Sequence, residues 1–255
     1  MAFSAHEVLE ESWNMSKRNY WAWWPVIIVA ALVIGISQIL AGLFTGWGSA
    51  VDGFFGALLA VIGALLSIIA ALLAVQMALG ILKNSYAVSG GERPSVSRLF
   101  EVRHFWWFLF ASLIFGVMVV IGLFALVVPG LIIAFMLGLF AYALIGGQAG
   151  NGFSALATSW DRISSHFWKY LGFRIVLTGV LPALLIAGVF VIGLLGGGAF
   201  LGFDALNGNA AGGIIAAILG FVAVIIMVLL YVWAITFTVV ADALAYRRLA
   251  PEWAE

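Results

Sequence analysis

The sequence predicts an all-α, polytopic membrane helix bundle, and three observations support this fold class. The 255 residues are 65% hydrophobic and only 9% charged, and the mean hydropathy of +1.20 is far above that of soluble domains. Long apolar runs recur along the chain, and the basic residues fall only in alternate connections between them. We therefore expect six transmembrane helices as three hairpins, each preceded by a short interfacial amphipathic helix.

Six apolar runs come close to or exceed the roughly 20 residues that a helix needs to cross a bilayer. They cover roughly residues 24–44, 54–82, 105–127, 131–147, 171–195 and 214–240, and the helices that contain them extend a few residues further. No connection between them is long enough for a soluble domain, so residues 1–255 are expected to form a single integral membrane domain.

The six runs pair into three hairpins, and a more polar segment precedes each hairpin. The expected bounds are 4–17, 95–103 and 152–164 for the interfacial segments and 24–82, 105–147 and 167–246 for the hairpins. A polar residue followed by two aromatics opens each hairpin, which suggests an internal repeat. An aromatic belt at the membrane boundary explains the same residues equally well. The three copies are Asn19-Tyr20-Trp21, His104-Phe105-Trp106 and His166-Phe167-Trp168.

Local signals predict where the helices begin, turn and bend. Ser4 with Glu7 predicts a capping box at the start of the first interfacial helix. Pro25 is expected at the start of the first membrane helix, where its missing N–H costs nothing. Pro129-Gly130 predicts a tight turn between the third and fourth runs, and Pro182 predicts a kink inside the fifth.

Small residues recur every three or four positions along the second run. Because small side chains let membrane helices approach closely, this helix is expected to be the most enclosed of the six. The stripe consists of Gly56, Ala60, Gly63, Ser67, Ala71, Ala74 and Ala78.

The basic residues orient the whole bundle. All eleven Lys and Arg lie before the first run, between the second and third, around the start of the fifth, or after the sixth. Cytoplasmic loops retain Lys and Arg during insertion, so we expect a multi-pass protein of the cytoplasmic membrane with both termini in the cytoplasm. The residues are Lys17, Arg18, Lys83, Arg93, Arg98, Arg103, Arg162, Lys169, Arg174, Arg247 and Arg248.

Two ionisable residues fall inside predicted membrane helices, where functional sites are first sought. Helical rise places Arg174 and Asp242 at similar depth on the cytoplasmic side of one hairpin. They form either an ion pair that joins the two helices or a substrate or proton site. Gln76 and Gln148 lie at comparable positions in the second and fourth runs. The four residues are therefore a candidate polar layer. It would either join neighbouring helices through polar contacts or line a cytoplasm-facing cavity.

Composition and motifs argue against other functions. The formal net charge is zero, so we expect no nucleic acid partner, and the absence of cysteine rules out disulfides and thiolate chemistry. His6, His104 and His166 are scattered without metal-ligand spacing, so no metal is expected. No hydrolase, metalloprotease or phosphate-loop motif is present. We therefore expect no cofactor and no enzymatic activity.

Short motifs near the predicted helix boundaries give the chain a resemblance to known proteins. They are Trp13 and Tyr20-Trp21 in the opening helix, Val128-Pro129-Gly130-Leu131 before the fourth run, and Ala155-Leu156 with Ser159-Trp160 before the fifth. With these motifs the chain resembles six-span bacterial and archaeal membrane proteins that include the membrane domain of glycerophosphodiester phosphodiesterases and related families of unknown function. The resemblance implies an all-helical module that works beside, or is fused to, another protein. The soluble barrel of some relatives is absent from the sequence, and no catalytic residue carries over.

Taken together, these features predict a non-enzymatic integral membrane module, an accessory or scaffold subunit of a membrane complex. Its expected partners are membrane lipids and other membrane protein subunits or a second copy of the chain. The alternative is a transporter or lipid-handling protein that uses the cytoplasm-side polar layer.

Overall fold

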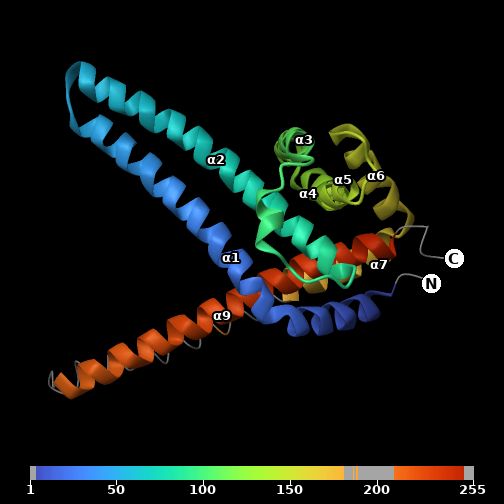
Figure 1. Cartoon of the computed structure of the whole chain (residues 1–255). Helices are drawn as coiled ribbons and strands as arrows, with labels where there is room; N and C mark the ends of the chain where they lie inside the picture. Colours follow the sequence, from blue (N-terminus) through green and yellow to red (C-terminus); the bar gives the residue numbers. More distant parts are fainter. Residues whose placement is uncertain (1–3, 181–185, 187, 189–209, 250–255) are drawn as a thin grey trace.

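The computed structural model describes residues 4–180, 186, 188 and 210–249, and all regular structure in these ranges is helical (Figure 1). The all-α prediction is therefore confirmed. The elements are α1 (Ala5–Ala50), α2 (Gly53–Ser89), η1 (Val96–Phe100), α3 (Phe105–Ala125), α4 (Val127–Leu137), α5 (Phe140–Ile145), α6 (Gly152–Ser165), α7 (Phe167–Ile175), η2 (Val176–Val180) and α9 (Ala210–Arg248).

Within the described residues, five helical stretches are long and apolar enough to cross a membrane. They are Ala5–Ala50, Gly53–Ser89, Phe105–Ala125, Val127–Ile145 and Ile225–Arg248, and they contain or overlap the predicted runs one to four and six. The predicted fifth run begins in α7, but most of it, including Pro182, lies outside the described residues. The membrane-helix class is confirmed, and the count of six stays a prediction.

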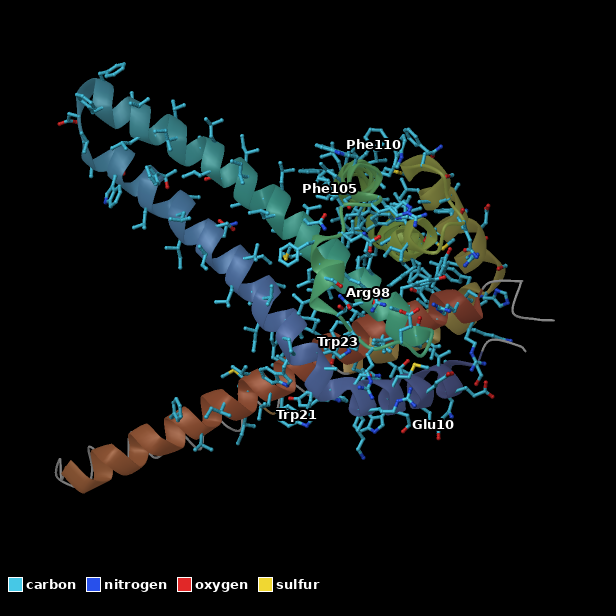
Figure 2. The ribbon with its side chains drawn as sticks, in the orientation of Figure 1. Glu10, Trp21, Trp23, Arg98, Phe105 and Phe110 are labelled. Carbon is cyan, nitrogen blue, oxygen red and sulfur yellow. The ribbon has the colours of Figure 1, made fainter. Side chains whose placement is uncertain are left out.

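Helix α1 differs from the expected interfacial helix followed by a separate membrane helix. It is one helix of 46 residues with Pro25 in its interior, so the prediction that Pro25 starts a helix is wrong. Figure 1 shows that α1 bends, and Figure 2 places Trp21 and Trp23 at the bend. Proline removes one backbone hydrogen bond and its ring clashes with the preceding turn, which kinks the helix. The N-terminal part thereby runs in a different direction from the longer part that follows Pro25, here called the membrane arm of α1.

The N-terminal cap of α1 also differs from the prediction. Ser4 is the N-cap of α1, as expected, but its side chain makes no capping hydrogen bond, so the capping box with Glu7 is wrong. A reciprocal box does form at α6, where the Asn151 side chain accepts from the Ser154 N–H and the Ser154 hydroxyl accepts from the Asn151 N–H. It fixes the start of the third predicted interfacial segment.

The predicted fourth membrane helix is interrupted, and its connection to the third is displaced. The chain turns at Leu126, a single extended residue between α3 and α4, and Pro129 lies in the first turn of α4. The turn expected at Pro129-Gly130 is thus three residues too late, because proline fits a first helical turn without losing a hydrogen bond. The fourth run then divides into α4 and α5 at Gly138 and Leu139.

The small residues of α2 pack against α1, but they do not enclose α2. A Cβ added at Gly63 would lie 2.6 Å from the backbone nitrogen of Thr45 on α1, so close helix approach is confirmed there. However, only 11% of the most apolar window of α2 is buried, compared with 50% for the stretch Val127–Ile145. The prediction that α2 is the most enclosed helix is therefore wrong, because the hairpin extends away from the other described helices (Figure 1).

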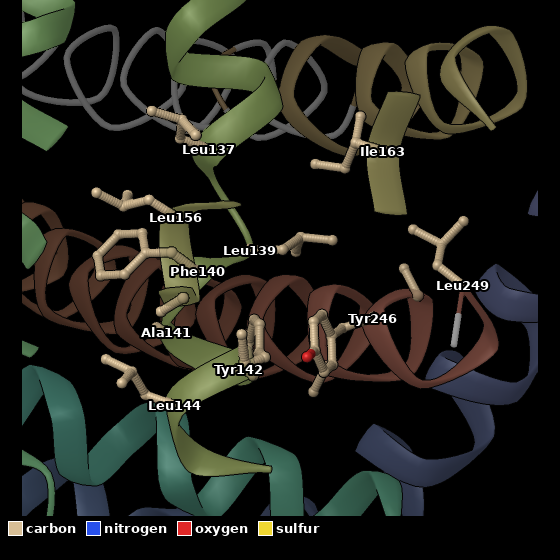
Figure 3. Close-up of a cluster of buried hydrophobic side chains, with 14 of the residues drawn as sticks. Leu137, Leu139, Phe140, Ala141, Tyr142, Leu144, Leu156, Ile163, Tyr246 and Leu249 are labelled. Atoms are coloured by element: carbon tan, nitrogen blue, oxygen red, sulfur yellow. The ribbon is translucent and has the colours of Figure 1, made fainter. Parts of the chain in front are cut away.

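The main hydrophobic core lies where α4, α5 and α6 meet the C-terminal end of α9 (Figure 3). Its residues labelled there are Leu137, Leu139, Phe140, Ala141, Tyr142, Leu144, Leu156, Ile163, Tyr246 and Leu249. A smaller cluster around the fully buried Trp23 joins α1, α2, η1 and α9. The described chain is therefore packed most densely at one end, from which the α1–α2 hairpin and α9 diverge.

Candidate functional site

The predicted contact between Arg174 and Asp242 is present. Nη1 of Arg174, in the last turn of α7, donates to Oδ1 of Asp242 on α9. The two side chains are 24% and 14% exposed, so the pair is largely removed from solvent. Arg174 Nη2 also lies 3.7 Å from the position that a Cβ on Gly138 would occupy. The ion pair therefore sits beside the interruption between α4 and α5.

Ser159 of α6 supplies hydrogen bonds at this interruption. The backbone N–H of Leu139 donates to Ser159 Oγ over 3.2 Å, and the Ser159 hydroxyl donates to the Met136 carbonyl over 2.9 Å. Ser159 is fully buried. Since unpaired backbone groups are costly away from water, one hydroxyl from a neighbouring helix allows the fourth run to break.

The helix that carries Arg174 also departs from α-helical geometry. α7 continues into η2, a π-helical segment, and the Thr178 hydroxyl donates to the Arg174 carbonyl over 2.7 Å. π-Helical turns occur mostly as short insertions and frequently at functional sites. The ion pair is thus flanked by two irregular helices.

Tyr142 connects the elements around this region. Its hydroxyl donates to the Val239 carbonyl of α9 over 3.0 Å and lies 3.3 Å from Ser85 Oγ of α2. Its ring centroid is 6.0 Å from that of Tyr246. Tyr142 therefore joins α2, α5 and α9 at one buried point.

Gln148 lies next to the same part of α9. Its side-chain oxygen accepts hydrogen bonds from Tyr246 and Arg162, and the Arg162 guanidinium stacks 4.2 Å from the centre of the Tyr246 ring. Tyr246 is one helical turn beyond Asp242. Gln148 and Asp242 are thus linked through consecutive turns of α9.

Gln76 has different partners. Its Nε2 donates to the carbonyls of Leu99 and Glu101 over 2.8 and 3.1 Å, so it holds the η1 segment against α2. Of the four residues of the predicted polar layer, the structure therefore pairs Arg174 with Asp242, links Gln148 to the same helix and gives Gln76 a separate anchoring role.

The contacts of Ser159, Tyr142 and Tyr246 were not predicted from the sequence. Ser159 belongs to one of the short motifs that carry the family resemblance, and no motif includes either tyrosine. Gly138 inside the fourth run and the glycine pair at 146–147 at its end signal an irregular helix. Combined with a polar residue in each facing helix, that signal would have pointed to side chains that satisfy a broken helix.

Comparison with protein families, with curated proteins and with solved structures finds no match in any of the three. The resemblance to the phosphodiesterase membrane domain therefore stays a prediction.

Proposed function

We propose that this chain is a non-enzymatic scaffold or accessory module of the cytoplasmic membrane that associates with a second copy of itself through α1. The main support is a stripe of small residues on the membrane arm of α1. A Cβ added at Gly35, Gly42 or Gly46 would meet no atom within 4 Å. Gly42 and Gly46 form a G-x-x-x-G motif, which brings membrane helices into close contact.

A polar side chain on the same face adds to this argument. At 100° per residue, Gln38 lies about 60°, 40° and 80° around the helix from Gly35, Gly42 and Gly46, so it falls on the same side of α1. Gln38 is exposed and forms no hydrogen bond to any described part of the chain. Because an amide in hydrocarbon gains from a partner across a helix interface, this stripe, here called the α1 stripe, is suited to a symmetric contact.

The position of the hairpin leaves the α1 stripe accessible. No other described segment lies alongside the outer part of the α1–α2 hairpin (Figure 1). By contrast, Arg174 and Asp242 satisfy each other inside the protein, which supports a structural role for that pair. The apolar arm would thus carry the interaction, and the densely packed end would hold the fold together.

Self-association is tested by native mass spectrometry of the protein solubilised in mild detergent. We expect a dimer that Gly42→Leu or Gly46→Leu converts to monomer. Gly116→Leu is the matched control, since a Cβ at Gly116 of α3 also meets nothing within 4 Å, and it should leave the dimer intact. A monomeric wild-type protein, a dimer that survives both Gly42→Leu and Gly46→Leu, or a dimer that Gly116→Leu also disrupts would contradict the proposal. If a different membrane protein co-purifies instead, the partner of α1 is that protein and not a second copy of the chain.

A transporter or lipid-handling function is the second candidate. It is favoured by the placement of the Arg174–Asp242 pair between an interrupted helix and a π-helix, since broken helices frequently form transport sites. Retention of a specific lipid or solute by the purified protein, lost in the Arg174→Gln/Asp242→Asn double variant, would support it over the scaffold.

A further inference from the structure

A separate pocket lies on the predicted cytoplasmic side, between the end of α2, the segment that contains η1 and the end of α9. Its volume is about 220 Å³, and Figure 2 labels Arg98 on this segment. Four basic side chains line it against the two acidic ones of Glu92 and Glu101, which leaves a net charge of +2 with His104 neutral. The basic residues are Lys83, Arg98, Arg103 and Arg247.

Existing contacts hold three of these cations in place. Lys83 Nζ donates to the Glu101 carbonyl over 2.7 Å. Arg98 pairs with Glu92. Arg247 donates to the Tyr86 carbonyl over 2.9 Å and stacks 4.1 Å from the centre of its ring. The pocket wall is therefore preorganised, which lowers the cost of binding a ligand.

Arg103 supplies positive charge that the described protein does not neutralise. It is exposed and forms no hydrogen bond or ion pair with any described residue. The next residue, His104, is the N-cap of α3 and makes no capping hydrogen bond through its side chain. The pocket thus borders a helix N-terminus, where the backbone dipole favours anions.

The charges that line the pocket also act on the imidazole of His104. Burial lowers the pKa of its imidazole, and the charges of Arg103 and Lys83 lower this pKa further, whereas Glu101 opposes them. The remaining groups of the lining, Glu92, Arg98 and Arg247, add one more net positive charge.

We propose that this pocket binds the phosphate group of an anionic ligand at the cytoplasmic membrane surface. Basic pockets between membrane helices on that side suit anionic headgroups, and Arg forms forked hydrogen bonds to phosphate. Two sources share this chemistry, the headgroup of an anionic phospholipid and a soluble phosphate ester. The site is independent of the α1 stripe, so either proposal can fail alone.

The test is lipid titration of the delipidated, detergent-solubilised protein, read by native mass spectrometry. Phosphatidylglycerol should bind and phosphatidylcholine should bind much more weakly. Arg103→Gln should weaken phosphatidylglycerol binding about fivefold, as expected for the loss of one hydrogen bond to the phosphate. Arg93→Gln is the matched control, because Arg93 is exposed in the same segment but lines a different pocket; it should leave binding unchanged.

A variant with the opposite expected effect keeps the proposal testable if Arg103→Gln does not fold. Glu101→Gln removes an acidic side chain from the lining but retains the carbonyl that binds Lys83, so it should tighten binding severalfold. Inorganic phosphate that displaces the lipid would identify a soluble ester as the ligand, and failure to displace it would identify the headgroup. Equal binding of both lipids, equal loss in Arg93→Gln and Arg103→Gln, or unchanged binding in Glu101→Gln would overturn the proposal.

Discussion

His104 adopts a left-handed backbone conformation, with a φ of 67°, immediately before α3. Among the described residues it is the only one besides glycine with a positive φ. Residues with a Cβ occupy this region at an energetic cost, although His, Asn and Asp tolerate it better than most. The conformation lets the chain reverse between Arg103 and the start of α3.

The first prediction concerns this backbone conformation. His104→Val should destabilise the protein by about 1–2 kcal/mol, because a β-branched side chain is poorly accommodated at positive φ. His104→Asn and His104→Gly should retain the wild-type stability. Thermal unfolding in detergent measures all three variants. If the Val and Asn variants unfold at the same temperature, the turn does not require a residue that tolerates a positive φ.

Single residues also show what sequence could and could not predict at the site. The pairing of Arg174 with Asp242 was predictable, because helical rise alone places both charges at one depth in a low-dielectric region. The partners of Gln76 were not predictable, since they are backbone carbonyls of the short η1 segment. Their position depends on how a loop folds back on α2, which no periodicity encodes.

Among the helical elements, the α4–α5 junction depends on α6. Ser159→Ala would leave the Leu139 N–H and the Met136 carbonyl without their partner, so we expect a loss of about 1–3 kcal/mol. Thr158→Ala is the control: the Thr158 hydroxyl donates only to the Ser154 carbonyl in its own helix, and its loss should have little effect. Comparable unfolding midpoints for the two variants in detergent would contradict this role of Ser159.

The contact between α7 and α9 gives a second prediction for the helical elements. Arg174→Gln or Asp242→Asn alone leaves one largely buried charge without its partner, which can cost about 3–5 kcal/mol, whereas removing both charges is often tolerated. We therefore expect both single variants to unfold at a lower temperature and the double variant to recover most of the loss. Additive losses in the double variant would show that the residues act independently.

The course of α1 illustrates a limit of sequence rules for helices. Proline is favoured in a first helical turn and disfavoured in an interior, so Pro25 was expected at a start. The chain instead accepts a kink, and the packing of Trp23 and Val26 against α2 and α9 accompanies it. Tertiary contacts near a proline can outweigh the local preference, and a sequence read alone does not contain those contacts.

At the scale of the whole molecule, hydropathy predicted the membrane class. A long apolar helix is stable in a bilayer whatever its neighbours are, because it satisfies its own backbone hydrogen bonds. The way in which the helices pack against one another could not be predicted from the sequence. Nothing in the composition of α2 distinguishes a helix enclosed by protein from one exposed to lipid, since both environments favour apolar and small residues. The dense end of the bundle and its diverging arms became visible only in the structure.

Orientation in the membrane gives the last prediction. The chain contains no cysteine, so single cysteines can be introduced at Ser49, next to the α1–α2 turn, and at Ser97, in η1; both positions are exposed. A membrane-impermeant maleimide added to intact cells should label the cysteine at Ser49 and not the one at Ser97, because basic residues surround only the second site. Permeabilised cells provide the control, in which both should react. The reverse pattern in intact cells would invert the topology.

The composition of the main core has a consequence for biosynthesis. Its residues include Phe140 of α5 and Tyr246 near the end of α9, so this core can close only after nearly the whole chain has been made. At about 5–20 residues per second, the ribosome needs roughly 5–20 s to proceed from the first of these residues to the second. During that interval the α1–α2 hairpin has already been made but lacks the packing of Val240 of α9 against its buried side chains. Because its two helices approach closely at Gly63 and Thr45, we expect the hairpin to hold together by itself until α9 is made.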